Sequence, residues 1–340
     1  MITHQSSLND FTSQISFVLN TYKDHGFKPN DFSNIIIGGL GGSGIGAQIV
    51  KAWFFDKIEI PIETIADYNL PAFANKNTLV ILNSYSGNTE ETISLFSEAK
   101  EKGCTIICIA AGGKLAELAS ENKLTFYALE EGFQPRMTIG YGLSFLFLIL
   151  GELSGHETRA ELEDVVDKFE EMHEYQMDSA EKIFRFFKAS FKNKFVVVAD
   201  KYYAPIGVRF CQQLNENSKL EGFVNVLPEA NHNVIESYYG RLATNFIFLY
   251  CDNNKRVHAR FDFLCSHLEL ENNKVLNMYI PEYSIYSIFD VIYRLDWVSL
   301  FLADENGVDT MKIKNIMELK EFLNELEIIE DNEEDIEQVS

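Results

Sequence analysis

Hydrophobic positions along the first half of the chain form two alternating patterns. Short runs that are apolar at nearly every position have the length of strands, and they occur at 34–37, 78–82, 105–110 and 124–129. Such continuous runs are typical of strands that are buried on both faces of a parallel sheet. Between them, segments such as 89–102 place apolar residues three or four positions apart, which predicts helices that cover the sheet. The first half therefore predicts a parallel α/β domain.

The same alternation returns in the second half of the chain. Strand-length apolar runs occur at 194–199, 245–250 and 275–280. The stretch 205–220 predicts a helix after the first of these strands, and the charged, periodic stretch 161–187 predicts a helix that links the halves. The predicted fold class is α/β, with two parallel sheets in tandem, each flanked by helices.

These patterns divide the chain into two domains and a tail. We expect a first domain over residues 1–155 and a second over residues 156–330, because 340 residues exceed what one core usually spans. Nine acidic residues lie between Glu321 and Glu337. Residues 331–340 are therefore expected to be an acidic, disordered tail.

Composition and charge restrict the partners of the protein. Hydrophobic residues make up 46% and charged residues 24%, as in a folded soluble protein. No apolar run reaches the roughly 18 residues of a membrane helix, and the first residues lack the pattern of a signal peptide, so we expect a cytoplasmic protein. The net charge of −22 argues against nucleic acid and anionic membranes as partners, since both require a basic surface.

The cysteines give no sign of a metal site. Five are scattered along the chain without a CxxC pair or a Cys/His cluster, which favours buried, reduced thiols. No metal and no organic cofactor are expected.

A glycine-rich loop, residues 38–46, follows the first predicted strand and opens a helix. It contains Gly39-x-Gly41-x-x-Gly44, which satisfies the dinucleotide-binding fingerprint, and Glu63 lies near the distance of a ribose-binding acid. Glycines at such a place let backbone N–H groups approach any anion at a helix N-terminus. The loop alone predicts an anion site and leaves its ligand open.

A second loop, Ser84–Thr89, lies between the next strand and helix and contains three hydroxyl groups, those of Ser84, Ser86 and Thr89. Thr89 is predicted as the N-cap of the helix. Hydroxyls and helix-terminal N–H groups together can surround a phosphate monoester, whereas capping needs only one such residue. The second half has no such loop after its second strand, so one phosphate site per chain is expected.

Together the two loops, 41–46 and 84–92, resemble those of the sugar isomerase (SIS) domain family. More narrowly, the chain is similar to the bifunctional phosphoglucose/phosphomannose isomerases, which contain two SIS domains. The similarity extends, in order, through 134–136, 214–217, 227–233 and 316–320. It implies two tandem SIS domains, hexose 6-phosphate substrates, isomerisation of glucose 6-phosphate and mannose 6-phosphate to fructose 6-phosphate without a cofactor, and a homodimer. The phosphate-binding candidates are Gly42, Ser43, Ser84, Ser86 and Thr89.

Four further residues match the family's catalytic positions. Moving a carbonyl between C1 and C2 requires a base that shuttles a proton, and stabilisation of the enediolate oxygens. The resemblance implies Glu216 as the base, Arg136 as the cation at the oxygens, and Lys320 as a lysine that reaches into the site. It implies that His232 assists ring opening and is contributed across the dimer interface to the neighbouring site.

One segment departs from the family pattern. Related proteins commonly have a proline-bearing segment before the last helix, where this chain has Asp309–Lys312. Thr310 is therefore only a candidate for the threonine that would help to admit both epimers.

Two other functions stay open at this point. The glycine fingerprint alone also fits an NAD-dependent oxidoreductase. SIS domains also occur as non-enzymatic sugar-phosphate-binding regulators, which usually carry a basic DNA-binding helix-turn-helix that neither the acidic charge nor the short N-terminal segment supports.

Overall fold

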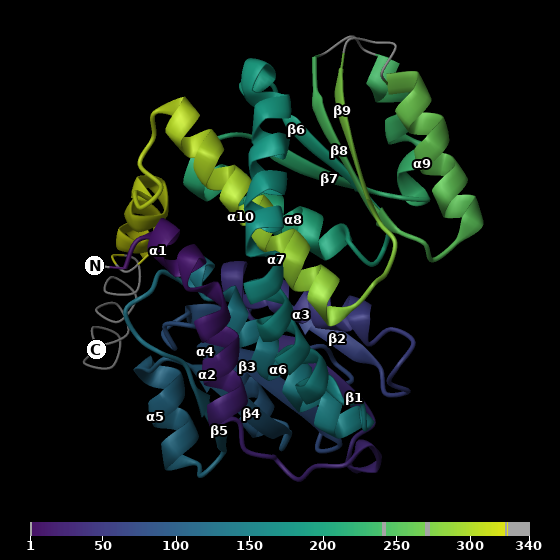
Figure 1. The fold of residues 1–340 in the computed structure, drawn as a ribbon. Helices are drawn as coiled ribbons and strands as arrows, with labels where there is room; N and C mark the ends of the chain where they lie inside the picture. Colours follow the sequence, from purple (N-terminus) through teal and green to yellow (C-terminus); the bar gives the residue numbers. More distant parts are fainter. Residues whose placement is uncertain (1, 240–242, 269–272, 324, 326–340) are drawn as a thin grey trace, which may run out of the picture.

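Two parallel β-sheets, one in each half of the chain, form the frame of the protein in the computed structural model, which describes residues 2–239, 243–268, 273–323 and 325 (Figure 1). The first sheet contains β1 (Asn34–Gly38), β2 (Ile62–Ile65), β3 (Thr78–Asn83), β4 (Thr105–Ala110) and β5 (Thr125–Ala128), in the order β2-β1-β3-β4-β5. The second contains β6 (Phe195–Ala199), β7 (Gly222–Val226), β8 (Asn245–Cys251) and β9 (Lys274–Ile280), in the order β7-β6-β8-β9. All neighbouring pairs are parallel, which confirms the predicted fold class. The predicted tail at 331–340 lies outside the described residues.

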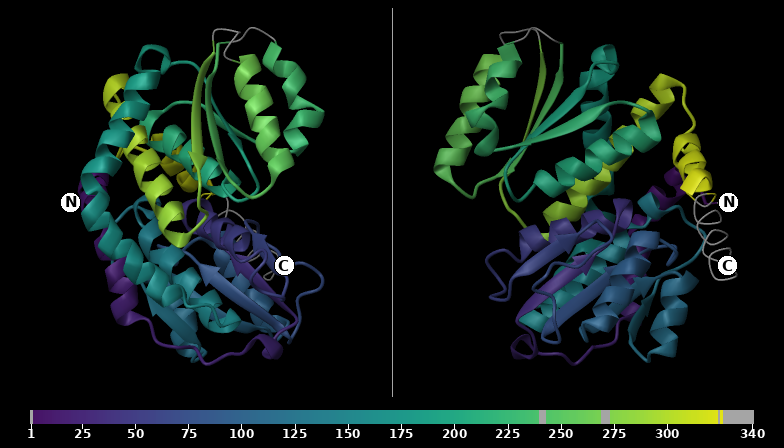
Figure 2. Two further views of the ribbon diagram at one scale, coloured as in Figure 1. Left: turned by 45° about the vertical axis from the view of Figure 1, so that its right-hand side comes forward. Right: turned by 180° about the vertical axis from the view of Figure 1, so that it is seen from behind.

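Ten labelled α-helices accompany the sheets within the described residues. They are α1 (His4–Asn9), α2 (Phe11–Thr21), α3 (Gly41–Trp53), α4 (Glu90–Glu101), α5 (Gly113–Glu121), α6 (Ile139–Ser154), α7 (Thr158–Phe187), α8 (Ala204–Gln213), α9 (Lys255–Leu268) and α10 (Ile285–Asn306). Residues 314–323 are helical as well. The helix predicted to link the halves is α7, and the two views of Figure 2 show it passing beside both sheets.

The central strands are apolar at nearly every inner position, with polar residues only at their ends, because both of their faces are buried. In β1, Ile35 and Ile37 face the helices that lie between the sheets, while Ile36 faces the outer layer of α4 and α5. In β6, Val197 faces the inner helices and Val196 faces the outer layer, which includes α9. This is the arrangement that the continuous apolar runs predict.

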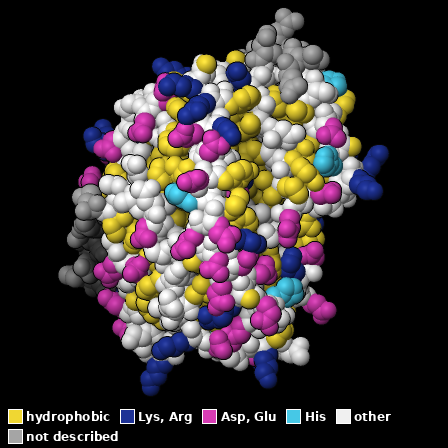
Figure 3. Space-filling view, in the orientation of Figure 1, with side chains coloured by type: hydrophobic (Ala, Val, Ile, Leu, Met, Phe, Trp, Pro, Cys, Tyr) yellow, Lys and Arg dark blue, Asp and Glu magenta, His cyan; other side chains and the backbone are white. Residues whose placement is uncertain are grey.

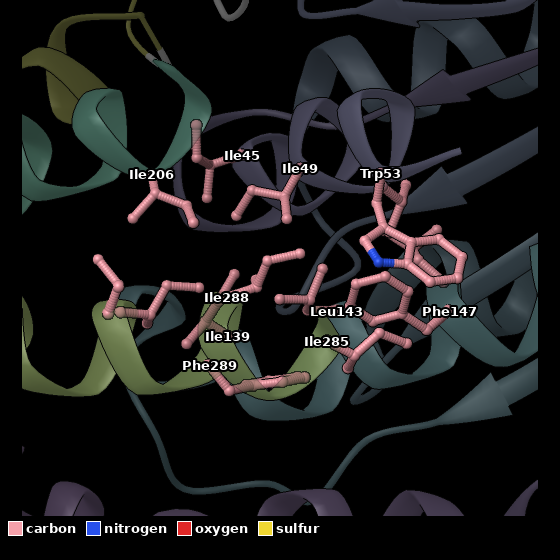
Figure 4. Close-up of a cluster of buried hydrophobic side chains, with 14 of the residues drawn as sticks. Ile45, Ile49, Trp53, Ile139, Leu143, Phe147, Ile206, Ile285, Ile288 and Phe289 are labelled. Atoms are coloured by element: carbon pink, nitrogen blue, oxygen red, sulfur yellow. The ribbon is translucent and has the colours of Figure 1, made fainter. Parts of the chain in front are cut away.

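A single apolar cluster lies between the two sheets (Figure 4). It joins helices of both halves, with Ile45, Ile49 and Trp53 from α3, Ile139, Leu143 and Phe147 from α6, Ile206 from α8, and Ile285, Ile288 and Phe289 from α10. Each fully buried aliphatic or aromatic side chain of this kind contributes about 1.5–3 kcal/mol. The halves are therefore packed against each other through a shared core.

The apolar runs do not predict two of the strands, β2 and β7, because polar residues or glycine interrupt both. β2 contains Glu63 and Thr64, β7 contains Gly222 and Asn225, and the residues of both strands are half-buried or exposed. Both lie at an edge of their sheets, but so do β5 and β9, which the apolar runs predict. The interrupting residues, and not the edge position alone, therefore remove the continuous apolar run. The helix predicted at 205–220 also differs, because α8 ends at Gln213 and continues as a π-helical turn, Leu214–Ser218.

The distribution of charged side chains on the surface is consistent with the net charge of −22. On the face shown in Figure 3, acidic side chains are widely spread, with lysines and arginines between them. None of the described helices is both long enough and apolar enough to cross a membrane.

Candidate active site

The two loops singled out in the sequence are neighbours in the structure. They follow β1 and β3, which are adjacent and parallel, so both loops emerge at the same edge of the sheet. The side-chain oxygen of Ser43, at the start of α3, accepts a hydrogen bond of 3.1 Å from the backbone N–H of Tyr85. The amide of Asn83 donates to the backbone oxygen of Ser43 at 3.0 Å. The glycine loop and the hydroxyl loop therefore form one surface.

Within the hydroxyl loop, Ser84 and Thr89 lie close together, with 2.9 Å between their hydroxyl oxygens. Thr89 is the N-cap of α4, as predicted, but its side chain makes no capping hydrogen bond to that helix. Ser86 is exposed and its hydroxyl accepts a hydrogen bond from the N–H of Asn88. Hydroxyls beside a helix N-terminus are suited to an oxyanion, so phosphate binding by these residues stays a prediction with suitable geometry.

Glycine at position 42 brings the first loop against a second cluster. A Cβ added to Gly42 would lie 2.9 Å from the backbone oxygen of Pro135 and 3.2 Å from the Cα of Arg136. These two residues belong to a short 3-10 helix, Pro135–Met137. The absence of a side chain therefore allows the start of α3 to approach Arg136 closely.

Arg136 is buried and points toward the second half of the chain. Its Nε donates to the Asn217 side-chain oxygen at 2.9 Å, and a terminal nitrogen donates to the Thr310 carbonyl at 2.5 Å. Its other terminal nitrogen lies 3.5 Å from a carboxylate oxygen of Glu216. Burial lowers the pKa of Arg136, and the charge of Glu216 partly offsets this. The predicted cation and the predicted base are thus direct neighbours, and Thr310 lies beside them.

Glu216 lies on the π-helical turn that continues α8, with 28% of its side chain exposed. It borders a surface hollow of about 510 Å³ that Lys219 and Lys312 also line. Lys219 has a left-handed backbone (φ 56°), and its ammonium donates to the carbonyl oxygens of Glu216 and Lys312. Burial, followed by the charge of Arg136, lowers the pKa of Lys219. The carboxylate is accessible to a small molecule and has two cations nearby.

The structure does not bring the other two predicted catalytic residues to this cluster. His232 ends a short 3-10 helix, Glu229–His232, and is exposed. Lys320 is exposed within the helical residues 314–323. Within the described parts of this single chain, neither side chain forms a hydrogen bond or ion pair with Arg136 or Glu216.

Buried residues that sequence reasoning did not identify surround Arg136. Arg209 donates to the backbone oxygen of Arg136 at 3.2 Å and pairs with Asp296 at 2.5 Å. His4 on α1 is 1% exposed, and burial, followed by the charges of Arg136 and Arg209, lowers its pKa to about 3. No motif marks these residues. The only sequence signal for this buried cluster is indirect: Asn217, which accepts a hydrogen bond from Arg136, is the residue next to Glu216.

Other predicted features have different surroundings. Glu63, the acid considered for a ribose, lies on β2 and pairs with Lys51 at 3.1 Å. None of the five cysteines forms a disulfide, but Cys104 and Cys265 are only partly buried, so the expectation of buried thiols holds for the other three. Across the described ranges, no group of three or more His, Cys, Asp or Glu side chains is placed to hold a metal ion.

Comparison with known proteins covers both halves of the chain. Residues 30–143 match the SIS domain, and residues 177–323 match the bacterial phospho-glucose isomerase C-terminal SIS domain. A bifunctional phosphoglucose/phosphomannose isomerase of Aquifex aeolicus is 33% identical over 303 residues, which cover 86% of this chain and 91% of that protein. One from Caldicellulosiruptor bescii is 33% identical over 311 residues, covering 88% and 92%.

The fold has solved counterparts as well. The C-terminal domain of glucosamine-fructose-6-phosphate aminotransferase from Francisella tularensis superposes with a TM-score of 0.72 at 13% identity. The superposition covers 91% of this chain and 98% of that domain, so the likeness concerns the arrangement of both sheets.

Proposed function

The chain belongs to the family of bifunctional phosphoglucose/phosphomannose isomerases, and we propose on that premise that it interconverts glucose 6-phosphate, and also mannose 6-phosphate, with fructose 6-phosphate. The observation that supports this most is the contact between Arg136 and Glu216, at 3.5 Å, beside the surface formed by the two loops. The relatives do not favour an NAD-dependent oxidoreductase or a non-enzymatic regulator.

The first domain holds the substrate by its phosphate. The hydroxyls of Ser43, Ser84, Ser86 and Thr89 donate to the phosphate oxygens, and the N–H groups at the starts of α3 and α4 face the same anion. Gly42 keeps this site close to Arg136. The phosphate therefore serves as the anchor, and the carbon atoms C1 and C2 extend toward the second domain.

Glu216 performs the proton transfer. Its carboxylate removes the proton from C2 of the open-chain aldose, and the electron pair shifts to the carbonyl oxygen at C1, so that an enediolate forms. The same carboxyl group then returns this proton to C1, while the hydroxyl proton at the C2 oxygen passes to the C1 oxygen and the C2 oxygen becomes the carbonyl of the ketose. All atoms of the substrate are retained, and no external oxidant or reductant is consumed.

Arg136 stabilises the intermediate of this transfer. Its guanidinium is buried and fixed by Asn217 and Thr310, so its charge is held in place before the negative oxygens develop. Thr310 is the proposed determinant that helps to admit the mannose epimer. Lys320 is proposed to approach the same oxygens.

His232 is proposed to act in the site of a second chain. Its exposed position at the end of a short helix makes it available to a partner, and in the resulting homodimer it would protonate the ring oxygen as the sugar opens. We propose domain boundaries at 1–155 and 156–330, supported by the left-handed turn at Gly155 between α6 and α7. The five cysteines, none of which forms a disulfide, support a reducing, cytoplasmic location.

The decisive experiment is a coupled assay of fructose 6-phosphate formation from each hexose 6-phosphate, with and without EDTA. We expect turnover with glucose 6-phosphate and with mannose 6-phosphate, unchanged by the chelator. Absence of turnover with both sugars would contradict the proposal. Protection against thermal unfolding by NAD, together with such inactivity, would support the oxidoreductase instead.

A further inference from the structure

The buried carboxylate of Asp200 lies at the carboxyl edge of the second sheet. In the first sheet, β1 lies between β2 and β3, and in the second sheet β6 lies between β7 and β8. By this strand order, the loop after β6 corresponds to the glycine loop after β1, and the loop after β8 corresponds to the hydroxyl loop after β3. Asp200 is the first residue after β6.

The hydrogen-bond donors around Asp200 come from the two loops that correspond to the proposed phosphate-binding loops. Cys251 is the last residue of β8, and Asn253 follows it in the loop that corresponds to the hydroxyl loop. Tyr202 and Tyr203 directly precede α8, in the loop that corresponds to the glycine loop.

Asp200 is 1% exposed, and both of its carboxylate oxygens are saturated with hydrogen bonds. One oxygen accepts from the backbone N–H groups of Tyr202 at 3.0 Å and Tyr203 at 2.8 Å. The other accepts from the N–H of Cys251 at 2.9 Å, the side-chain amide of Asn253 at 2.7 Å and the Cys251 thiol at 3.4 Å. We call this set of donors the anion seat of the second domain.

The first domain differs because the loop after β1, residues 39–40, and the hydroxyl loop contain no acidic side chain. A Cβ on Gly39 would lie 2.6 Å from the backbone oxygen of Asn83, so no longer side chain fits there. The first domain therefore supplies no carboxylate of its own at this edge. In the second domain, burial raises the pKa of Asp200, and the hydrogen bonds from Cys251, Tyr203 and Tyr202 oppose this effect.

We propose that the carboxylate of Asp200 is an internal ligand that permanently occupies the anion seat of the second domain, in the place that a substrate phosphate takes in the first. The comparison with the first domain rests on the proposed function, whereas occupation of the seat does not. The ligand class that the seat recognises is a small oxyanion. The second sheet thus offers no free phosphate site, and the start of α8 is tied to the end of β8.

Chemical rescue tests this proposal. Asp200→Ala removes the carboxylate and leaves a small space lined by N–H donors, so we expect its thermal unfolding midpoint to fall by about 5–10 °C. Formate has the size of the missing carboxylate group. Replacing chloride with formate at equal ionic strength should raise the midpoint of Asp200→Ala by several degrees more than that of the wild type, and the bulkier propionate should do so less.

The controls make either outcome decisive. Asp252→Ala, at an exposed neighbouring position, should neither lose stability nor respond to formate. An equal formate response in Asp200→Ala and the wild type would overturn the proposal. Because the readout is stability, a failed rescue would leave the proposed isomerase activity untouched, and an inactive wild type would leave the rescue result intact.

A second variant decides the matter if Asp200→Ala does not fold. Asp200→Asn keeps the shape but turns an amide toward N–H donors, so its midpoint should fall by about 5 °C or more without a formate response, because the seat remains filled. A midpoint equal to that of the wild type would show that the seat requires no anion and would overturn the proposal.

Discussion

At the carboxyl edges of the two sheets, the corresponding loops have different side chains, hydroxyl groups in the first domain and a buried carboxylate in the second. After β1 and β3, residues 39–40 and the hydroxyl loop contain no acidic side chain, and the hydroxyls of Ser84 and Thr89 lie 2.9 Å apart. After β6 and β8, the carboxylate of Asp200 accepts hydrogen bonds from the N–H groups of Tyr203 and Cys251. Repetition of a fold therefore does not repeat its site. The second domain instead contributes Glu216, from the opposite end of α8.

The largest effect is expected when the contribution of the second domain is removed. Glu216→Gln keeps the shape but cannot accept a proton, so kcat should fall by about 10²–10⁴-fold. Inorganic phosphate should remain a competitor of similar strength, because the phosphate is held by the first domain. Steady-state kinetics of the coupled reaction measure both quantities.

The matched control for this variant is Glu221→Gln, an exposed glutamate that lines the same hollow. Its kcat should equal that of the wild type. If Glu216→Gln retained normal turnover, another group would perform the proton transfer. The proposal that the first domain binds the phosphate and the second supplies the base would then be wrong.

A smaller effect of a different kind is expected in the first domain. Removing both hydroxyls in Ser84→Ala/Thr89→Ala deletes hydrogen bonds to a charged group, which should raise KM for glucose 6-phosphate about 10–100-fold. The change in kcat should be minor by comparison. Ser97→Ala, on the exposed side of α4, serves as the control and should leave KM unchanged. An unaltered KM in the double variant would argue against phosphate binding by this loop.

The last effect concerns stability and not turnover: His4, whose pKa is lowered to about 3 by burial and by the charges of Arg136 and Arg209, is kept neutral in the folded chain. Below pH of about 6.5 the unfolded chain binds a proton at His4 that the folded chain does not. The free energy of unfolding should therefore decrease as the pH falls from about 6.5 toward 3, with His4 contributing up to about 1.4 kcal/mol per pH unit.

Denaturant unfolding between pH 4.5 and 7.5 measures this contribution. The His4→Gln variant should show a shallower loss of stability than the wild type over that range. His173→Gln, at an exposed position on α7, should show the slope of the wild type. Equal slopes in all three proteins would mean that His4 is protonated in the folded state.

Sequence patterns predicted the central strands and singled out the two loops for physical reasons that apply locally. A strand such as β1 is buried on both faces and is apolar at Ile35, Ile36 and Ile37, and the hydroxyl density of 84–89 exceeds what capping needs. Asp200 could not be found in this way, because it is one of 51 acidic residues and its partners come from segments about fifty positions apart. The prediction for Lys320 depended on family resemblance, and its exposed position in the single chain leaves it untested.

The reach of Arg136 across the chain has a consequence for protein synthesis. The first sheet is complete at residue 128, and domains generally begin to fold while the chain emerges from the ribosome. Among the described residues, the first polar partners of the Arg136 side chain to be made are Glu216 and Asn217, and the last is Thr310. A chain interrupted before Thr310 would contain both sheets and still lack the last contact of Arg136. On the proposed function, binding of the phosphate group can therefore arise earlier in synthesis than turnover.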